Sequence, residues 1–306
     1  MPALSILEEG QRVSLKTERG VVSFDRVQGV VVSLTAGSIE LLSRPMTGCF
    51  VRAPTDIDHA IGDGGLAAHW KNAGLGRLRN TVEQFSLQHV GDKQVHVRVV
   101  STLYAEDAAA SIRRETTYIV FGSGDLIIDE RVSLDAPIVS FARVGLRAGL
   151  FGSFGRLRWY GRGPFENYPD RKAAALVGDY SANVSDLLTP YVYPQENGLR
   201  CDVRWVALTS EDDIGLLVRG MPVFCMSALP VWLEDLEAAT NLADLSVRDE
   251  ISLHCDGFHM GVGGDTGWTI NVHPEYRLPP GHYRYALRLR PLLADDDPTV
   301  VGSERL

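Results

Sequence analysis

The chain has 306 residues, of which 45% are hydrophobic and 23% are charged, and these proportions are ordinary for a globular protein that buries a large core. No stretch approaches the roughly 20 consecutive apolar residues of a membrane helix, so we expect no membrane span. The formal net charge of −9 disfavours contact with a phosphate backbone, and we expect no nucleic-acid partner.

Short alternating apolar runs separated by turn residues fill the first half of the chain, and this pattern predicts one β-strand after another. The first three strands are expected at 13–16, 21–24 and 30–34, with glycine-containing turns between them. A helix of two turns is expected at 66–73. A second hairpin is predicted from 116–120, a turn at 122–125 and a strand at 126–134.

Helical signal is sparse in the second half, where apolar spacing predicts a short helix near 234–243. Alternation at 283–290 predicts a half-buried strand. The acidic run 295–297 predicts a solvated tail over 295–306 and not a metal site, because three successive side chains cannot all point inward. We therefore expect one all-β domain over 1–306, a large antiparallel β-sandwich.

The cysteines and the first residues bear on the compartment. Residues 1–12 lack a basic segment followed by an apolar core and a cleavage site, which predicts a cytoplasmic location. Cys49, Cys201, Cys225 and Cys255 are widely spaced and form no pair or cluster at zinc spacing. Reduced, mostly buried thiols and no metal site in this chain are the expectation.

Two parts of the chain crowd aromatic, proline, glycine and polar residues together: 159–171 with 189–200, and 256–268. Sugars present hydroxyl rims and weakly polar C–H faces, so their sites combine carboxylates, amides and arginines with an aromatic surface. The alternative is that these residues only fix long loops over the core. The glycines at 261–264 do not indicate nucleotide binding, because no Lys-Ser/Thr follows them.

Five segments in order carry a family resemblance: FVRAPTDID (50–58), HWKNAGL (69–75), WYGRGPFENYPDR (159–171), TPYVYPQENGLR (189–200) and DGFHMGVGGDTGW (256–268). They resemble successive signatures of the β-galactosidase small chain, which is the C-terminal domain of glycoside hydrolase family 2 β-galactosidases or a separate chain in heterodimeric members. The resemblance covers nearly the whole chain and is weakest over 207–247. It implies a large antiparallel supersandwich similar to galactose mutarotase.

The resemblance also implies site residues. The tryptophan after the glycine-rich loop, here Trp268, is expected to stack on the substrate in a neighbouring barrel, with Asp265 and His259 nearby. The sequence Gly264-Asp265-Thr266-Gly267-Trp268 departs from the common Gly-Gly-Asp-Asp-Ser-Trp pattern, which affects the placement of Trp268. Residues 58–67 correspond to a mobile loop of the family.

Three charged residues near that loop have two interpretations. Arg52, Asp56 and Asp58 are expected to contact sugar or partner, and a buried ion pair between loops is the alternative.

No catalytic residue is assigned to this chain. Retaining hydrolysis needs an acid/base carboxyl and a nucleophilic carboxylate about 5 Å apart, and in the family both lie on a TIM barrel. This sequence lacks the alternating strands and helices of a barrel. The resemblance therefore implies a barrel-bearing partner that hydrolyses terminal β-D-galactosides and holds the magnesium ions, in an oligomer, with β-galactoside or galactose as ligand and no cofactor in this chain.

Two other functions compete with this one. A free-standing mutarotase-like enzyme would need a base and an acid converging on the sugar, and His259, His273, Glu196 and Glu275 are the candidates. Ordinary hydrogen bonding in strands or loops is the favoured explanation of the histidines, because spacing alone demonstrates no pairing. A structural module for oligomerisation would instead bury the aromatic loops in a protein interface.

Overall fold

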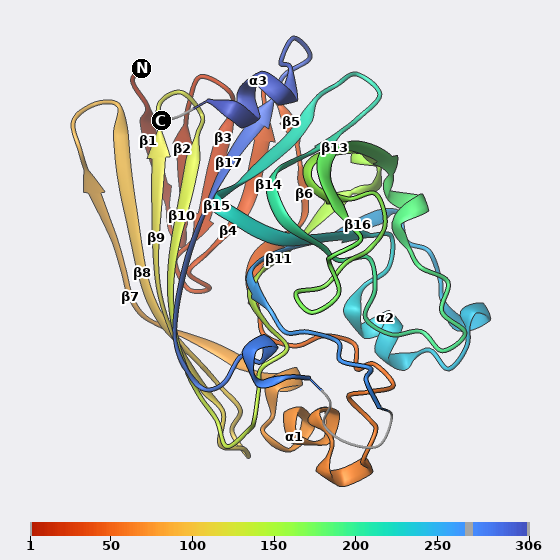
Figure 1. Ribbon diagram of the computed structural model, residues 1–306. Helices are drawn as coiled ribbons and strands as arrows, with labels where there is room; N and C mark the ends of the chain where they lie inside the picture. Colours follow the sequence, from red (N-terminus) through yellow and green to blue (C-terminus); the bar gives the residue numbers. More distant parts are fainter. Residues whose placement is uncertain (1, 267–271, 305–306) are drawn as a thin grey trace.

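The computed structural model describes residues 2–266 and 272–304, and within them the strands are antiparallel and form two sheets that share β15 (Figure 1). The first sheet has the order β1-β2-β3-β4-β6-β11-β16-β15-β14-β12-β13. The second has the order β7-β8-β9-β10-β17-β15. The short strand β5 pairs with β4.

The strand bounds of the first sheet and β5 are β1 Ser5–Glu9, β2 Arg12–Lys16, β3 Val21–Asp25, β4 Val30–Ala36, β5 Ile39–Glu40, β6 Leu42–Cys49, β11 Arg143–Phe151, β12 Arg156–Gly163, β13 Leu176–Asn183, β14 Arg200–Thr209, β15 Gly215–Leu229 and β16 Glu250–His259. Those of the second sheet are β7 Arg79–His89, β8 Gln94–Tyr104, β9 Ser111–Phe121, β10 Leu126–Asp135 and β17 Gly281–Leu292. The helices are α1 Leu66–Asn72, α2 Leu233–Ala238 and α3 Pro298–Ser303.

The long strand β15 joins the two sheets. Its first part, Gly215–Gly220, pairs with β17 of the second sheet, and its last part, Cys225–Leu229, pairs with β16 of the first. The core lies between the sheets, where the ring of Phe24 on β3 meets Tyr118 on β9 edge-on with centroids 5.0 Å apart. Period-two alternation puts every second residue of β9 on this inner face, which is why the pattern was visible in the sequence.

The predicted elements are largely confirmed. Strands β2, β3 and β4 match the first three predictions, and β9, β10 and β17 match the later ones. The helix expected at 66–73 is α1, and the one expected near 234–243 is the shorter α2. The cysteines are free thiols, of which Cys225 is the only one that is not fully buried. No helix within the described residues is long and apolar enough to cross a membrane.

The solvated tail predicted over 295–306 is wrong for its described part. Pro298 occupies the first turn of α3, and the Asp297 carboxylate accepts a hydrogen bond from the Thr299 backbone at its start. The helix packs Val301 against Trp205 on β14, leaving Val301 3% exposed. Asp296 forms an ion pair with Arg19 instead of facing water.

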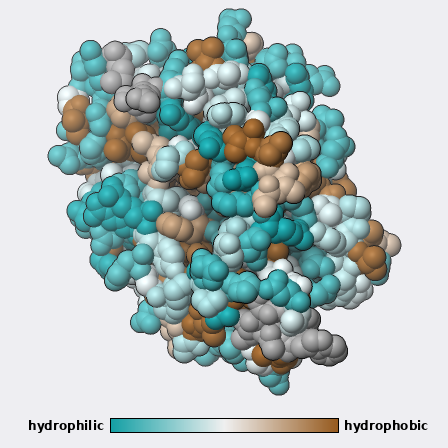
Figure 2. Space-filling model, viewed as in Figure 1, coloured by the Kyte–Doolittle hydropathy of each residue, from teal (hydrophilic) through white to brown (hydrophobic). Residues whose placement is uncertain are grey.

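Both ends of the described chain lie beside the β9–β10 hairpin. Pro2 contacts Gly122 in its turn, and the Glu304 carbonyl accepts a hydrogen bond of 3.0 Å from Arg288, which also pairs with Asp125 of the hairpin. Helix α1 and the loops around it lie at the opposite end of the molecule (Figure 1). Figure 2 shows mostly hydrophilic residues on the face viewed, with apolar residues in small separate groups.

Candidate functional site

The signature segments of the sequence meet at the end of the molecule that carries α1. We call this region the loop end and define it as residues 50–65, 164–175, 188–199 and 260–266. Backbone hydrogen bonds connect its segments: Glu196 N donates to Ala53 O at 3.1 Å, and Asn167 N donates to Leu199 O at 2.8 Å. Residues more than 100 positions apart in the chain are thus joined in one structure.

An ion pair with no exposed side-chain surface holds the first of these segments. Arg52 donates from Nε to Asp58 Oδ2 at 3.0 Å and from Nη2 to Asp58 Oδ1 at 2.8 Å. Its Nη1 donates to the Gly261 carbonyl at 3.0 Å, and the Thr55 backbone N–H donates to Asp58 at 2.8 Å. Burial lowers the pKa of Arg52, but Asp58 outweighs it and the pKa is raised. We call this pair the clamp, because it ties segment 50–58 to segment 260–266.

Asp170 fixes the start of the glycine-rich loop. Its carboxylate accepts hydrogen bonds from the backbone N–H groups of Val262 and Gly263, at 3.0 and 2.7 Å. A Cβ at Gly261 would lie 2.3 Å from the same carboxylate, so glycine is required for this close approach. The backbone at residues 261–263 is therefore fixed, and this sets the direction in which residues 264–266 follow.

Glu166 connects the two aromatic segments in a similar way. It accepts hydrogen bonds from Gly198 N at 2.8 Å, from Thr189 Oγ1 at 3.2 Å and from the hydroxyl of Tyr191, and it pairs with Arg171 at 2.9 Å. A single carboxylate thus holds the start and the end of segment 189–198.

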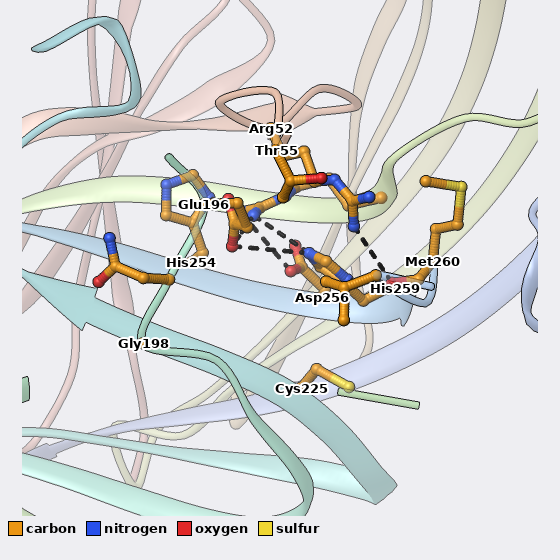
Figure 3. A network of polar contacts seen from close by, with 12 residues as sticks. Arg52, Thr55, Glu196, Gly198, Cys225, His254, Asp256, His259 and Met260 are labelled. Carbon is orange, nitrogen blue, oxygen red and sulfur yellow. Dashed lines mark hydrogen bonds and ion pairs between the residues drawn. The ribbon is translucent and has the colours of Figure 1, made fainter. Parts of the chain in front are cut away.

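A cluster of ionisable groups surrounds Arg143 at the start of β11. Figure 3 shows four of its members, Glu196, His254, Asp256 and His259, close to one another. Arg143 Nη2 lies 2.7 Å from Glu196 Oε1 and 3.3 Å from His259 Nε2, and its Nη1 lies 2.5 Å from His254 Nδ1. Asp256 Oδ2 is 3.7 Å from the same nitrogen Nη1. We call these five side chains the Arg143 cluster.

A β-bulge brings His259 into the cluster. The register of the β11–β16 pair shifts between Val144, which opposes Phe258, and Gly145, which opposes Asp256. Strand β16 therefore carries one extra residue, Gly257. His259 then lies on the same side of the sheet as His254 and Asp256. A Cβ at Gly257 would come within 2.2 Å of the Tyr285 ring, so only glycine fits at the bulge.

Hydrogen bonds define the protonation of His259. A guanidinium only donates, so His259 Nε2 accepts from Arg143, and Nδ1 carries the proton that it donates to the Met260 carbonyl at 2.7 Å. Burial lowers the pKa of His259, which keeps the ring neutral. Burial also opposes ionisation of Glu196, but the Arg143 guanidinium favours the carboxylate, and the pKa of Glu196 is lowered to about 2. The Glu196 carboxylate and the His259 nitrogen are thus both turned toward one guanidinium.

Asp256 is the least satisfied member of the cluster. Among the described residues neither of its carboxylate oxygens has a hydrogen-bond partner, and the same holds for Arg143 Nε. Burial raises the pKa of Asp256 to about 7, and the opposing effect of Arg143 is not sufficient to reverse this. The carboxyl therefore changes charge near neutral pH.

The predicted site residues have different positions in this arrangement. Arg52 and Asp58 form the buried ion pair that was the alternative to sugar contact, so a sugar could reach them only if the clamp opened. Asp56 is exposed, and its backbone N–H donates to Gln195 at 3.2 Å. Asp265 is exposed and pairs with His273 at 2.6 Å, and Trp268 lies outside the described residues.

The mutarotase hypothesis also receives a partial answer. The structure brings Glu196 and His259 to 3.7 Å, but Glu196 is 6% exposed and His259 is 4% exposed. His273 pairs with Asp265 at the surface, away from this pair.

The residues 62–64 of the expected mobile loop form a 3-10 helical turn directly before α1.

Sequence reasoning missed the central role of Arg143. The available signal was an arginine at the start of a mostly apolar strand that also contains Arg147, since burying such a charge requires carboxylate partners. Asp170 belongs to segment 159–171, and its hydrogen bonds to Val262 and Gly263 agree with the alternative given for that segment, the fixing of long loops.

Within the described residues, no group of three or more His, Cys, Asp and Glu side chains is arranged to hold a metal ion.

Comparison with known proteins places this geometry in a family. The family model described as "Beta galactosidase small chain" matches residues 16–289. A β-galactosidase from Vibrio cholerae is 33% identical over 92% of this chain and 27% of its own length. One from Vibrio vulnificus strain YJ016 is 30% identical over 95% of this chain and 28% of its own length. The chain thus spans little more than a quarter of these relatives.

A solved structure shares the fold. The galactose 1-epimerase of Lactobacillus acidophilus NCFM matches with a TM-score of 0.51 at 8% identity, covering 94% of this chain and 98% of that one. The expected galactose mutarotase-like architecture is therefore confirmed. The family-model match along residues 16–289 and the 33% identity to the Vibrio cholerae β-galactosidase show that the chain belongs to the β-galactosidase small chain family.

Proposed function

We propose that this chain completes the active site of a β-galactosidase whose catalytic carboxylates lie on another domain or chain. In this proposal the glycine-rich loop presents Trp268 to the galactosyl ring of a terminal β-D-galactoside. The observation that carries it is the anchoring of that loop: Asp170 holds Val262 and Gly263 by their backbone, and Arg52 holds Gly261. A loop fixed at its base can hold an indole at a defined place for stacking.

The chemistry of the loop end supports a sugar as the ligand. An indole face packs against sugar C–H groups, and this contributes on the order of 1 kcal/mol beyond the area buried. Asp265 and His273, both more than half exposed, offer a carboxylate and an imidazole for hydroxyl groups close to the same loop. Magnesium ions and the acid pair for hydrolysis are expected on the partner.

The Arg143 cluster favours a partner-dependent enzyme over a free-standing epimerase. Anomer interconversion needs a base and an acid that reach the sugar. Here Glu196 and His259 are buried and share a guanidinium, so each is occupied by an intramolecular contact. An ionised carboxylate with a pKa of about 2 is also a weak base.

The test is hydrolysis of a chromogenic β-galactoside by the chain assembled with a barrel-bearing catalytic chain of the family. Trp268→Ala is expected to lower kcat/KM by about tenfold, equivalent to about 1.4 kcal/mol, and Trp268→Phe to restore part of it. Phe151→Ala is the matched control, because Phe151 is an exposed aromatic (43%) at the far end of β11 from Arg143.

Assembly is monitored by size-exclusion chromatography, so that loss of binding to the partner is separated from loss of substrate stacking. Unchanged kcat/KM for Trp268→Ala in an intact assembly would contradict the stacking role. Hydrolysis by the purified chain alone at an ordinary enzymatic rate would contradict the division of labour.

A further inference from the structure

A pocket of about 400 Å³ opens between the two sheets, and its lining includes no residue of the loop end beyond Phe50 and Val51. Leu103 on β8 and Arg114 on β9 form one wall, and Thr47 on β6 and Arg147 on β11 form the other. Small-molecule sites in proteins have volumes of about 300–1,000 Å³ and are mostly apolar with a few placed polar groups. This pocket lies at the small end of that range.

Arg114 is a fixed polar group in this pocket. Its side chain is 5% exposed, and it donates from Nε and Nη2 to Glu130 at 3.2 and 2.6 Å. Thr116 donates to the same carboxylate at 2.7 Å, so Glu130 is held as well. The remaining nitrogen, Nη1, has no hydrogen-bond partner among the described residues and faces Gly48. A Cβ at Gly48 would lie 3.0 Å from Nη1, so glycine leaves this donor uncovered.

The charges around the pocket point to a neutral ligand. Arg114 is neutralised by Glu130, and Arg147 is neutralised by Glu234 at 2.7 Å. Glu237 on α2 also lines the pocket, so these five groups carry a net charge of −1. An anion such as phosphate would meet no excess positive charge.

The remaining lining suits the two faces of a sugar. Phe50, Leu75, Leu78 and Leu103 supply apolar surface for ring C–H groups. Asn80 at the edge keeps its side-chain oxygen as an acceptor while its nitrogen donates to the Gln28 carbonyl. Arg114 supplies a donor, and Glu237 supplies an acceptor, for hydroxyl groups.

We propose that this pocket between the sheets is a binding site for a neutral hexopyranose, formed by Arg114, Asn80 and Glu237 over an apolar floor. The site belongs to this chain by itself and does not depend on Trp268 or on the function proposed above. A carbohydrate bound there would bridge β9 of the second sheet and the α2 side of the first.

The test uses saturation-transfer difference NMR with millimolar D-galactose on the full chain carrying Trp268→Ala, which removes the other expected sugar contact. Galactose signal is expected in this background. Gly76→Tyr should then abolish it, because Gly76 lines the pocket and a Cβ added there meets no atom within 4 Å, so the ring can fill the space without a clash. Leu7→Tyr on β1, at a 57% exposed position, is the control that should keep the signal.

A second variant makes the outcome independent of Gly76. Glu237→Arg changes the pocket from a net charge of −1 to +1, and the signal of D-galacturonate should rise relative to that of D-galactose. Absence of galactose signal in the Trp268→Ala chain, or equal signal in Gly76→Tyr, would overturn the proposal. Loss of the signal on assembly with the catalytic chain would also overturn it, since the pocket would then be a protein contact.

Discussion

Two buried arginine sites, the clamp and the Arg143 cluster, lie next to each other and differ in how completely they are satisfied. In the clamp, Arg52 donates to both oxygens of Asp58 and to a backbone carbonyl, and the Asp58 carboxylate also accepts from a backbone N–H group. In the cluster, Arg143 is divided among four partners, and Asp256 has no hydrogen bond among the described residues.

This difference gives the two sites different roles: the clamp is a structural connection, whereas the Arg143 cluster contains a carboxyl that titrates. In a buried bidentate pair with both carboxylate oxygens hydrogen-bonded, the guanidinium and the carboxylate fix each other in place. A carboxyl that is buried without donors is neutral at low pH and pays an electrostatic penalty on ionisation. The clamp therefore holds the loops in place, while the cluster beneath them responds to pH.

The largest expected effect is that of breaking the clamp. Arg52→Ala should lower the free energy of unfolding by about 3–5 kcal/mol, because it leaves the Asp58 carboxyl without its arginine in a site with no solvent exposure. Chemical denaturation monitored by tryptophan fluorescence measures this. A loss below 1 kcal/mol would show that the clamp is no stronger than a surface pair.

Replacement of Glu196 tests the negative charge of the cluster. The folded-state pKa of about 2 lies below the ordinary 4.5, so this carboxylate contributes stability that is present above about pH 4.5 and is lost as the pH falls towards 2. Glu196→Gln should cost about 3 kcal/mol at pH 7 and little near pH 2. Denaturation curves at both pH values check this, and a cost that does not change with pH would contradict it.

Replacement of Asp256 tests a pH dependence of stability opposite to that of Glu196. Its folded-state pKa of about 7 lies above the ordinary 3.8, so its contribution to stability is fully present below about pH 3.8 and is lost as the pH rises through 7. Asp256→Asn removes this loss, and between pH 5 and 8 the variant should gain about 2–3 kcal/mol relative to wild type.

The two histidines of the cluster make stability fall, not rise, as the pH is lowered. They are unchanged in Asp256→Asn and so serve as an internal control. Burial lowers the pKa of His254 and His259, so protonation of the unfolded chain reduces stability on the acid side in wild type and variant alike. The free energy of unfolding is measured by chemical denaturation between pH 5 and 8. If it varied with pH in the same way for Asp256→Asn and wild type, Asp256 would not titrate in this range.

The smallest expected effect comes from an exposed copy of the clamp geometry. Arg284 binds Asp129 with the same distances of 3.0 and 2.8 Å, but its side chain is 63% exposed. Arg284→Ala should lower the free energy of unfolding far less than Arg52→Ala does, because water screens the pair and solvates the carboxylate left behind. A cost equal to that of Arg52→Ala would show that geometry, and not burial, sets the strength of the clamp.

The sheet was predictable from the sequence because strand alternation is a local property. In β9 every second side chain is buried, and the same period of two is present in the amino-acid sequence. The packed end at α3 was not predictable from three aspartates in a row, since the docking of Val301 depends on Trp205 almost 100 residues away.

The site was predictable as a set of segments but not as a set of contacts. The signature motifs indicated which loops belong together, and the structure places them in one region. Pairing of Arg143 with Glu196 depends on a β-bulge at Gly257 and on a long-range loop contact, and neither leaves a periodic signal in the sequence. The role of Trp268 stays a prediction.

The position of the two ends beside the β9–β10 hairpin has a practical consequence for engineering this chain. A fluorescent protein or an affinity peptide fused through a flexible linker before Pro2 would extend from the side opposite α1. Such a reporter would leave the glycine-rich loop uncovered, so surface immobilisation by this end presents the loop end outward.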